Sequence, residues 1–532
     1  MTEVVDAVVV GAGPNGLAAA NVLADAGWDV VVLEGQATPG GAVRTEQLTE
    51  PGFHHDVFSS FYPLGAAAPT MRELHLEDHG LRWCHAPAPV AHVLDGERAA
   101  VLHRDPERTA ESLARFAPSD REAWLRWSAW WARTGPHLVD ALMRPFPPVR
   151  AGGRLARTLG AGGLLELGRL GVLTVRRHTS EEFSGEGARV LLAGNALHAD
   201  FTPESPGGAI YGWTLVGLGQ QVGFPIPEGG AARLAEAMVR RLEAAGGALR
   251  CGQRVVRIDG RTRDVHTAGG ATVRARRAVL AATDAPTLYE DLLQGVELPD
   301  RLRSDLRRFE WDPSTIKVDW ALDGPIPWTA PGAELAGTVH LADDLDFLTR
   351  WGTDLQLGRV PERPFVVLGQ YARADPTRMP AGKEVGWAYT HIPQGSWRPG
   401  LEDEIADRVE AEVERRAPGF RALIRARHVL APPDFEARDA NLRGGALNGG
   451  TAQLHQQLVF RPVPGLGRAS TPVGGVYLAS ASAHPGGGVH GAAGTNAARA
   501  ALAAQKAPRR ARTAGTVLTR MVRSRKTDQR SR

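Results

Sequence analysis

The segment after the N-terminus constrains the fold more than any other part of the chain. An apolar run ending at Val10 is followed by glycines at positions 11, 13 and 16 and then by a helix-forming stretch, Leu17–Ala24. In such a strand, turn and helix, the unpaired N–H groups and dipole of the helix N-terminus attract phosphate, and glycine lets a pyrophosphate approach the backbone. We therefore expect a diphosphate site made by the following residues: Gly11, Ala12, Gly13, Pro14, Asn15 and Gly16.

An acidic residue follows at the spacing that a dinucleotide site requires. The run Trp28–Leu33 predicts a second strand, and Glu34 stands at its end. A carboxylate in this place accepts hydrogen bonds from ribose hydroxyls and repels a 2′-phosphate. Strand, turn, helix, second strand and acid all occur within about 30 residues. This order favours an adenosine dinucleotide with free ribose hydroxyls over a glycine turn that binds nothing.

Two further segments resemble FAD oxidoreductases of the phytoene desaturase and amine oxidase superfamily. One is Thr38–Thr45, and the other is the glycine-rich stretch after His484, which precedes a helix predicted to begin near Gly488. In that superfamily the first segment lines the diphosphate and the flavin entrance, and the second contacts the flavin. The alternatives are an ordinary surface arginine in the first segment and an ordinary loop in the second. The resemblance implies FAD as the cofactor and these contacts to it: Gly40, Gly41, Arg44, Gly486, Gly487, Gly488 and Val489.

A third segment is similar to the part of these enzymes that returns to the FAD domain in mid-chain. Leu234, Met238 and Leu242 predict a helix with one apolar side, and a strand around Val255 follows. The resemblance implies that the backbone at Val255 contacts the adenine. The chain departs from its relatives at Ser480, where they often have glycine, and we do not expect Ser480 to be a ligand.

The length of 532 residues exceeds that of one compact core. We expect an α/β fold, in which a Rossmann-type FAD-binding domain of three discontinuous segments is interleaved with an α+β substrate domain. The expected FAD-binding domain comprises residues 1–70, 223–297 and 465–505, the substrate domain comprises 71–222 and 298–464, and 506–532 forms a basic tail expected to be disordered.

Charge and hydropathy exclude several classes of protein. The tail holds ten of the 62 basic residues and one of the 59 acidic residues, so the body is acidic and no nucleic-acid partner is expected. The tail is either a solvated segment or a peripheral membrane contact. No run of 18 apolar residues and no basic leader occur, so we expect a cytoplasmic protein without a membrane span.

The side chains themselves offer little chemistry. Cys84 and Cys251 form no CxxC pair, and neither a Ser/His/Asp triad nor an HExxH motif stands out, so no metal site or disulfide redox centre is expected. This composition fits chemistry carried by a cofactor. His484 and Tyr211 are candidate catalytic residues for proton handling, and His198 is a third candidate that fits a structural hydrogen bond better.

The insert carries a tryptophan-rich helix. Ser119 and Glu122 predict a capping box at its start. Four tryptophans follow at helical spacing and fit core packing better than the lining of an extended apolar substrate site; they are Trp124, Trp127, Trp130 and Trp131.

The leading functional hypothesis is dehydrogenation or desaturation of an apolar small molecule, such as a polyene, isoprenoid or lipid-like compound. A hydride would pass from a saturated carbon to flavin N5, and the electrons would then leave to an acceptor that the sequence does not identify. The alternatives are a flavin amine oxidase, a redox-neutral isomerase, and a flavoprotein whose FAD is structural and which binds a protein or a membrane.

Overall fold

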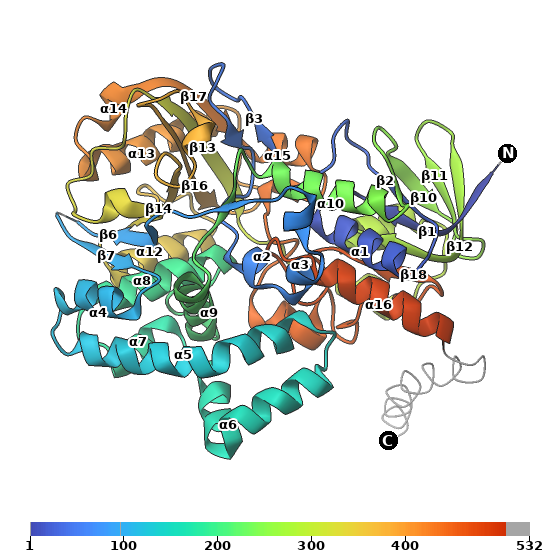
Figure 1. Ribbon diagram of the computed structural model, residues 1–532, viewed down its shortest axis with the longest axis horizontal. Helices are drawn as coiled ribbons and strands as arrows, with labels where there is room; N and C mark the ends of the chain where they lie inside the picture. Colours follow the sequence, from blue (N-terminus) through green and yellow to red (C-terminus); the bar gives the residue numbers. More distant parts are fainter. Residues whose placement is uncertain (1, 96, 507–532) are drawn as a thin grey trace.

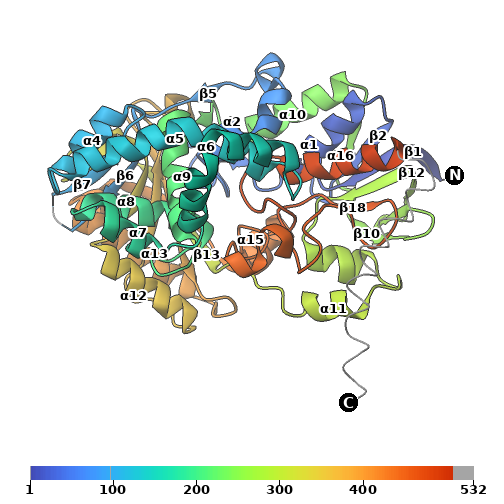
Figure 2. The same ribbon diagram turned by 90° about the horizontal axis from the view of Figure 1, so that it is seen from below.

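The computed structural model describes residues 2–95 and 97–506 (Figures 1 and 2). Two seven-stranded sheets, one at each end of the long axis, organise this part of the chain (Figure 1). The first has the order β10-β11-β12-β1-β2-β9, and β18 pairs with β12. Its strands are β1 (Glu3–Val10), β2 (Val30–Leu33), β9 (Ala248–Arg250), β10 (Val255–Ile258), β11 (Asp264–Thr267), β12 (Thr272–Ala281) and β18 (Val476–Leu478).

The first sheet is apolar on both faces, as its parallel strands require. Val9 and Val32 pack beneath α1 (Pro14–Asp25), α10 (Ala232–Ala244) and α16 (Ala492–Lys506). Val8 and Val31, which point the other way, pack against the antiparallel ribbon β10-β11, a helical turn at Thr287–Leu292 and α11 (Asp300–Leu306). Helices α1, α10 and α16 therefore cover one face of the first sheet, and the ribbon with the two shorter helical segments covers the other.

The second sheet has the order β17-β13-β16-β15-β14-β6-β7. Helix α13 (Leu401–Arg416) covers one face, and α8 (Glu186–Ala196), α9 (Gly208–Gln221) and α12 (Leu345–Gln356) cover the other. Its strands are β6 (Ala88–Val93), β7 (Ala99–Leu102), β13 (Ser314–Leu322), β14 (Ala336–Leu341), β15 (Val366–Gln370), β16 (Glu384–Ile392) and β17 (Ile424–Leu430).

The remaining elements are short or lie outside the two layers. Helices α4 (Pro106–Ala114), α5 (Asp120–Met143), α6 (Val149–Leu170) and α7 (Val175–Glu182) lie beside α8 and α9 (Figure 2). The others are α2 (Pro63–Ala67), α3 (Pro69–Glu73), α14 (Phe420–Leu423), α15 (Pro432–Arg438), and the two-residue strands β3 (Thr45–Glu46), β4 (His55–Asp56), β5 (Trp83–Cys84) and β8 (Ile226–Pro227).

The α/β fold class predicted from the sequence is confirmed. The domain limits stay a prediction, although the strands of the first sheet come from residues 3–33, 248–281 and 476–478. The predicted tail lies outside the described residues, apart from its first residue. Within the described residues, no helix is both long and apolar enough to cross a membrane.

Two local predictions are wrong. The last helix begins at Ala492 and not near Gly488, because Gly488 and Gly491 have positive φ values of 107° and 66°, which a right-handed helix excludes. No capping box forms at Ser119, whose own dihedral angles are helical. The carboxylate of Asp120 instead accepts from the backbone N–H groups of Ser184 and Gly185, at 2.7 and 2.9 Å. All four tryptophans of the stripe are buried, as expected for core packing.

Candidate functional site

The glycine turn between β1 and α1 is held together by a close backbone approach. Gly11 has a φ of 96°, and a Cβ on Gly16 would lie 2.0 Å from the Gly11 carbonyl oxygen. Glycine at position 16 is therefore required by the protein's own packing. Gly13 differs, because the nearest atom to a Cβ there would be the Cα of Gly41 at 3.8 Å. The turn therefore leaves room at Gly13 that the protein itself does not fill.

Glu34 is fixed at the end of β2 and directed towards the turn. Its buried carboxylate accepts from the backbone N–H groups of Ala12 at 2.7 Å and Gln36 at 2.8 Å. The backbone N–H of Gln253 donates to the Glu34 carbonyl at 2.7 Å, so the chain that enters β10 at Val255 runs beside the acid. The structure thus brings the diphosphate turn, the predicted ribose acid and the predicted adenine contact together.

The loop that carries Gly40, Gly41 and Arg44 lies on the same turn. The N–H of Gly40 donates to the Ala12 carbonyl at 3.0 Å, and a Cβ on Gly41 would lie 3.0 Å from the Gly13 Cα. The Arg44 guanidinium is buried and donates to two backbone carbonyls, while its Nε has no partner. A buried cation with an unpaired donor beside a helix N-terminus fits a diphosphate.

The C-terminal segment meets this turn from the other side. Strand β18 lies parallel to β12, which in turn lies parallel to β1. Helix α16 packs so tightly on α1 that a Cβ on Gly494 would lie 1.8 Å from the Asn15 carbonyl oxygen. The segments from the two ends of the chain therefore lie side by side (Figure 1).

The loop before α16 is clamped between two parts of the protein. A Cβ on Gly487 would lie 2.6 Å from Oδ1 of Asn448, and a Cβ on Gly65 in α2 would lie 2.7 Å from the Val489 carbonyl oxygen. The φ values of Gly486 and Gly488, 117° and 107°, are in the region that favours glycine. Gly486–Val489 is thus held in a conformation that ordinary side chains disfavour.

Unpaired polar atoms in this region test whether FAD fits. Buried polar groups normally have a hydrogen-bond partner. Four buried atoms without one belong to the turn, the glycine-pair loop, the residues just after β12, and the first turn of α16: Asn15 Oδ1, Arg44 Nε, Thr283 Oγ1 and Thr495 Oγ1. Donors and acceptors left open along this path fit a dinucleotide that spans from the diphosphate turn to the last helix.

A buried arginine that the sequence analysis missed organises the flavin side of the site. Arg461 donates to the carbonyl of Ala481 at 2.9 Å and to four carbonyls in residues 448–451 at 2.8–3.3 Å. A Cβ on Gly486 would lie 3.4 Å from its guanidinium. No motif in the sequence marks Arg461, because its partners are backbone carbonyls from two distant loops.

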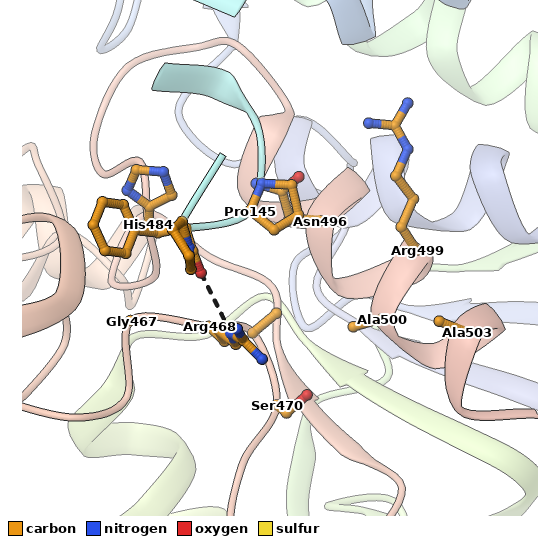
Figure 3. Close-up of a pocket in the computed structure, with 12 residues that line it drawn as sticks. Pro145, Gly467, Arg468, Ser470, His484, Asn496, Arg499, Ala500 and Ala503 are labelled. Atoms are coloured by element: carbon orange, nitrogen blue, oxygen red, sulfur yellow. Dashed lines mark hydrogen bonds between the residues drawn. The ribbon is translucent and has the colours of Figure 1, made fainter. Parts of the chain in front are cut away.

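The guanidinium of Arg461 contributes to the pKa values of both predicted catalytic residues, His484 and Tyr211. Nε2 of His484 hydrogen-bonds to the Arg144 carbonyl at 3.0 Å, and burial lowers its pKa to about 4. Tyr211 packs on Phe201 with ring centroids 4.3 Å apart, and burial raises its pKa to about 12. Both are therefore neutral at neutral pH. His484 also lines a surface pocket of about 390 Å³ (Figure 3). The catalytic roles of both residues stay predictions.

His198 takes part in a buried hydrogen-bond chain. Its Nε2 lies 2.8 Å from Nε2 of His340, and its Nδ1 lies 3.3 Å from the hydroxyl of Tyr389. Burial lowers the pKa of His198 to about 4, so it too is neutral. These contacts agree with the structural hydrogen bond weighed from the sequence.

A second missed feature is a buried ion pair that joins β4 to the segment between β15 and β16. Arg378 donates to both carboxylate oxygens of Asp56, at 2.9 and 3.1 Å, and both side chains are fully buried. The Tyr371 hydroxyl and the Ala231 N–H also donate to Asp56, at 2.9 and 2.7 Å. In the sequence, the only sign of this ion pair is Asp56, which ends the segment Gly52–Asp56 that follows the glycine pair Gly40 and Gly41.

Replacing Arg461 with lysine should weaken FAD binding by about tenfold. A lysine keeps the charge but cannot reach five carbonyls, and each buried carbonyl left unpaired costs about 1–3 kcal/mol. We expect the free energy of unfolding to fall by at least about 2 kcal/mol. FAD titration and urea unfolding measure both effects, with the exposed Arg261→Lys as control. An unchanged FAD affinity would show that the loop before α16 does not need Arg461.

Fold and site together define an FAD-dependent oxidoreductase. The chain belongs to the flavin containing amine oxidoreductase family, which it matches over residues 15–502. It is similar to pyridine nucleotide-disulfide oxidoreductase domain-containing protein 2 of Rattus norvegicus, with 29% identity over 93% of this chain and 92% of the relative. Phytoene dehydrogenase of Streptomyces griseus is 29% identical over 81% of this chain and 83% of its own length.

A solved structure shows the same fold. Cyclohexylamine oxidase from Brevibacterium oxydans superposes with a TM-score of 0.56 over 94% of this chain and 98% of that chain, at 19% identity. The family match and the relatives confirm the superfamily and the FAD cofactor that were predicted from the sequence.

Proposed function

We propose that this chain dehydrogenates an apolar polyene, isoprenoid or lipid-like substrate. When bound, FAD supplies the two-electron acceptor for this chemistry, with N5 receiving the hydride. One C–H bond of the substrate loses a hydride, the neighbouring C–H bond loses a proton to water or a weak base, and a C=C bond forms between the two carbons.

The observation that carries this proposal is the neutral, aromatic lining beneath α8 and α9. The face of β16 towards these helices presents Trp387 and Tyr389, whose rings are parallel with centroids 6.1 Å apart, and Phe61 lies 6.2 Å from Trp387. Burial lowers the pKa of His391 on the same face to about 4. An uncharged wall of rings and imidazoles fits a hydrocarbon better than an ammonium group.

The charged groups near this wall already have partners within the protein. Lys317 on β13 is paired with Asp319, and Asp56 is paired with Arg378. Asp200 accepts from the Thr451 hydroxyl and the Ala452 N–H at 2.6 and 2.9 Å. The substrate amine of an amine oxidase would have to compete with these partners for a carboxylate. The similarity to the Streptomyces griseus phytoene dehydrogenase supports the same substrate class.

The protein's own residues would bind, orient and exclude water. The turn from Gly11 to Gly16 and the Arg44 guanidinium would hold the diphosphate, and Glu34 would accept from the ribose. The loop Gly486–Val489 and the N-terminus of α16 would stabilise negative charge at the pyrimidine end of the flavin ring. The aromatic wall would keep water from the reacting C–H bond.

Anaerobic mixing of the holoprotein with two sets of donors tests the proposal. We expect isoprenoid or polyene donors to bleach the visible absorbance of FAD and to yield a product with two hydrogens fewer, as read by mass spectrometry. Alkylamines should leave the absorbance unchanged. Bleaching by amines, with hydrogen peroxide formed in air, would establish the amine oxidase alternative. A product of unchanged mass formed with reduced FAD would establish an isomerase, and a flavin that no donor reduces would establish a structural FAD.

A further inference from the structure

We infer that α6 and the residues flanking it form a docking surface for an anionic lipid bilayer. In the described part of the chain, ten large hydrophobic residues are exposed, and four of them lie in or next to α6. Val149 is 78% exposed, Leu164 40%, Leu165 77% and Val172 62%. Apolar side chains concentrated in this way on one element mark an interaction surface.

Helix α6 projects from the body and packs on one side only. Figure 1 shows it below the helical layer, and Figure 2, seen from below, shows it in front of that layer. Its buried side chains Ala151 and Leu155 pack on Ala141 of α5 in a small separate cluster. At Gly162 and Gly168, a Cβ would meet nothing within 4 Å. The outer surface of α6 is therefore uncovered by the described chain.

The charges of α6 complement an anionic surface. The helix carries four arginines and a single acid, Glu166. Arg154 is paired with Asp140, but among the described residues Arg150 and Arg157 have no ionic partner, and both are exposed. Gly160, with a φ of 65°, divides α6 into two arms: Arg150 and Arg157 lie in the first arm, and the exposed leucines lie in the second. Unpaired arginines and exposed apolar side chains on one projecting element are the pattern of a surface that lies in the interface of a membrane containing anionic lipid.

A second apolar segment adjoins the start of α6. Leu458, Val459 and Phe460 are 41%, 39% and 45% exposed. This segment contacts Gly467, where a Cβ would lie 2.6 Å from the Val459 Cα. The next residue, Arg468, donates from Nε to the Phe146 carbonyl at 3.3 Å, three residues before α6 begins. Seven of the ten exposed hydrophobic residues thus belong to two neighbouring segments.

The surface pocket that contains His484 opens between these segments. Phe146 and Arg468 line it, and Figure 3 shows the hydrogen bond that joins them. His484 also lines it, two residues before the loop Gly486–Val489. A bilayer bound at α6 would therefore lie over a pocket that reaches the residues next to the predicted flavin loop. The unpaired arginines of α6 favour an anionic partner, and the acyl chains of a bilayer can adapt to its exposed leucines.

Vesicle co-sedimentation of the full-length holoprotein tests this inference. We expect binding to vesicles of phosphatidylcholine with phosphatidylglycerol and weaker binding to phosphatidylcholine alone. The double variant Leu164→Ser/Leu165→Ser should bind the anionic vesicles at least about tenfold less tightly. The matched control is Leu357→Ser, because Leu357 is 57% exposed at the end of another helix, α12. FAD content and thermal unfolding should stay the same in both variants.

Three results would overturn the inference. The double serine variant could bind as tightly as the parent, or binding could vanish on truncation after Gln505 while the serine variant retains it, which would assign the contact to the tail. Light scattering could also show an oligomer that the serine substitutions dissociate, which would make α6 an interface between copies of the chain. Arg150→Gln/Arg157→Gln should remove the preference for anionic vesicles. Vesicle binding does not require turnover, so its failure and that of the proposed dehydrogenation are separate results.

Discussion

Replacing Gly13 with valine is expected to abolish FAD binding while leaving the fold intact. The backbone of Gly13 is extended, with φ −72° and ψ 173°, which valine adopts readily. The nearest protein atom to a Cβ would be 3.8 Å away, so the chain itself leaves room for a β-carbon at this position. The diphosphate does not, because it must approach this backbone closely. We expect the affinity for FAD to fall at least about 100-fold, to the point that the purified protein is colourless.

Two other substitutions separate loss of cofactor from loss of fold. Gly16→Ala should unfold or misfold the N-terminal unit, because its Cβ would lie 2.0 Å from the Gly11 carbonyl oxygen. Gly324→Val is the matched control, since Gly324 has open space around it and lacks a positive φ. Circular dichroism and FAD release on denaturation report fold and cofactor separately. Stoichiometric FAD in Gly13→Val would contradict the assignment of the turn.

The parts of the site that follow local rules could be predicted from the sequence. Gly11, Gly16 and Glu34 are specified by spacing within one strand-turn-helix-strand unit, and the structure places them as that spacing requires. The contact between α16 and α1 was reached through a resemblance to known enzymes. Spacing alone does not show that a helix starting at Ala492 packs on Asn15, because that contact depends on how the two ends of the chain meet.

The residues that sequence analysis missed make contacts that no side-chain motif records. Arg461 binds carbonyls, which every residue carries, so its role leaves no pattern in side-chain identity. The start of α16 was misplaced because Gly488 and Gly491 have positive φ values, which end any helix there. The loop that contains them is held against Asn448 and α2. Resemblance located the loop, but packing decided where the helix begins.

Replacing Arg378 with methionine is expected to lower the free energy of unfolding by about 3–5 kcal/mol. The substitution leaves the Asp56 carboxylate buried without its cation, beside the Tyr371 hydroxyl and the Ala231 N–H. Those donors cannot replace the lost charge. Because Asp56 lies in β4 and Arg378 between β15 and β16, the contact of the β3-β4 hairpin with the second sheet should be weakened most. Urea unfolding followed by tryptophan fluorescence measures the loss.

The double variant Asp56→Asn/Arg378→Met is the control for this pair. It removes both charges of the Asp56–Arg378 pair but leaves Asp375, whose buried carboxylate also accepts from Arg378 at 2.8 Å, so it should recover only part of the stability that Arg378→Met loses. Equal stability of the single and double variants would show that the cost of Arg378→Met does not come from the uncompensated charge of Asp56. A loss below about 1 kcal/mol in the single variant would instead place the pair among weak surface ion pairs.

The pH dependence of the free energy of unfolding tests the Asp56–Arg378 pair independently. Burial alone would raise the pKa of Asp56, but the Arg378 guanidinium and the other donors hold it below its ordinary value. A carboxyl group whose pKa is lower in the folded state stabilises the fold above the unfolded pKa, and this contribution is lost as the pH falls through the folded pKa. The stability advantage of the parent over Arg378→Met should therefore be full at pH 7 and shrink once the pH drops below about 4. An advantage that grew on acidification would mean that Asp56 is protonated in the folded protein.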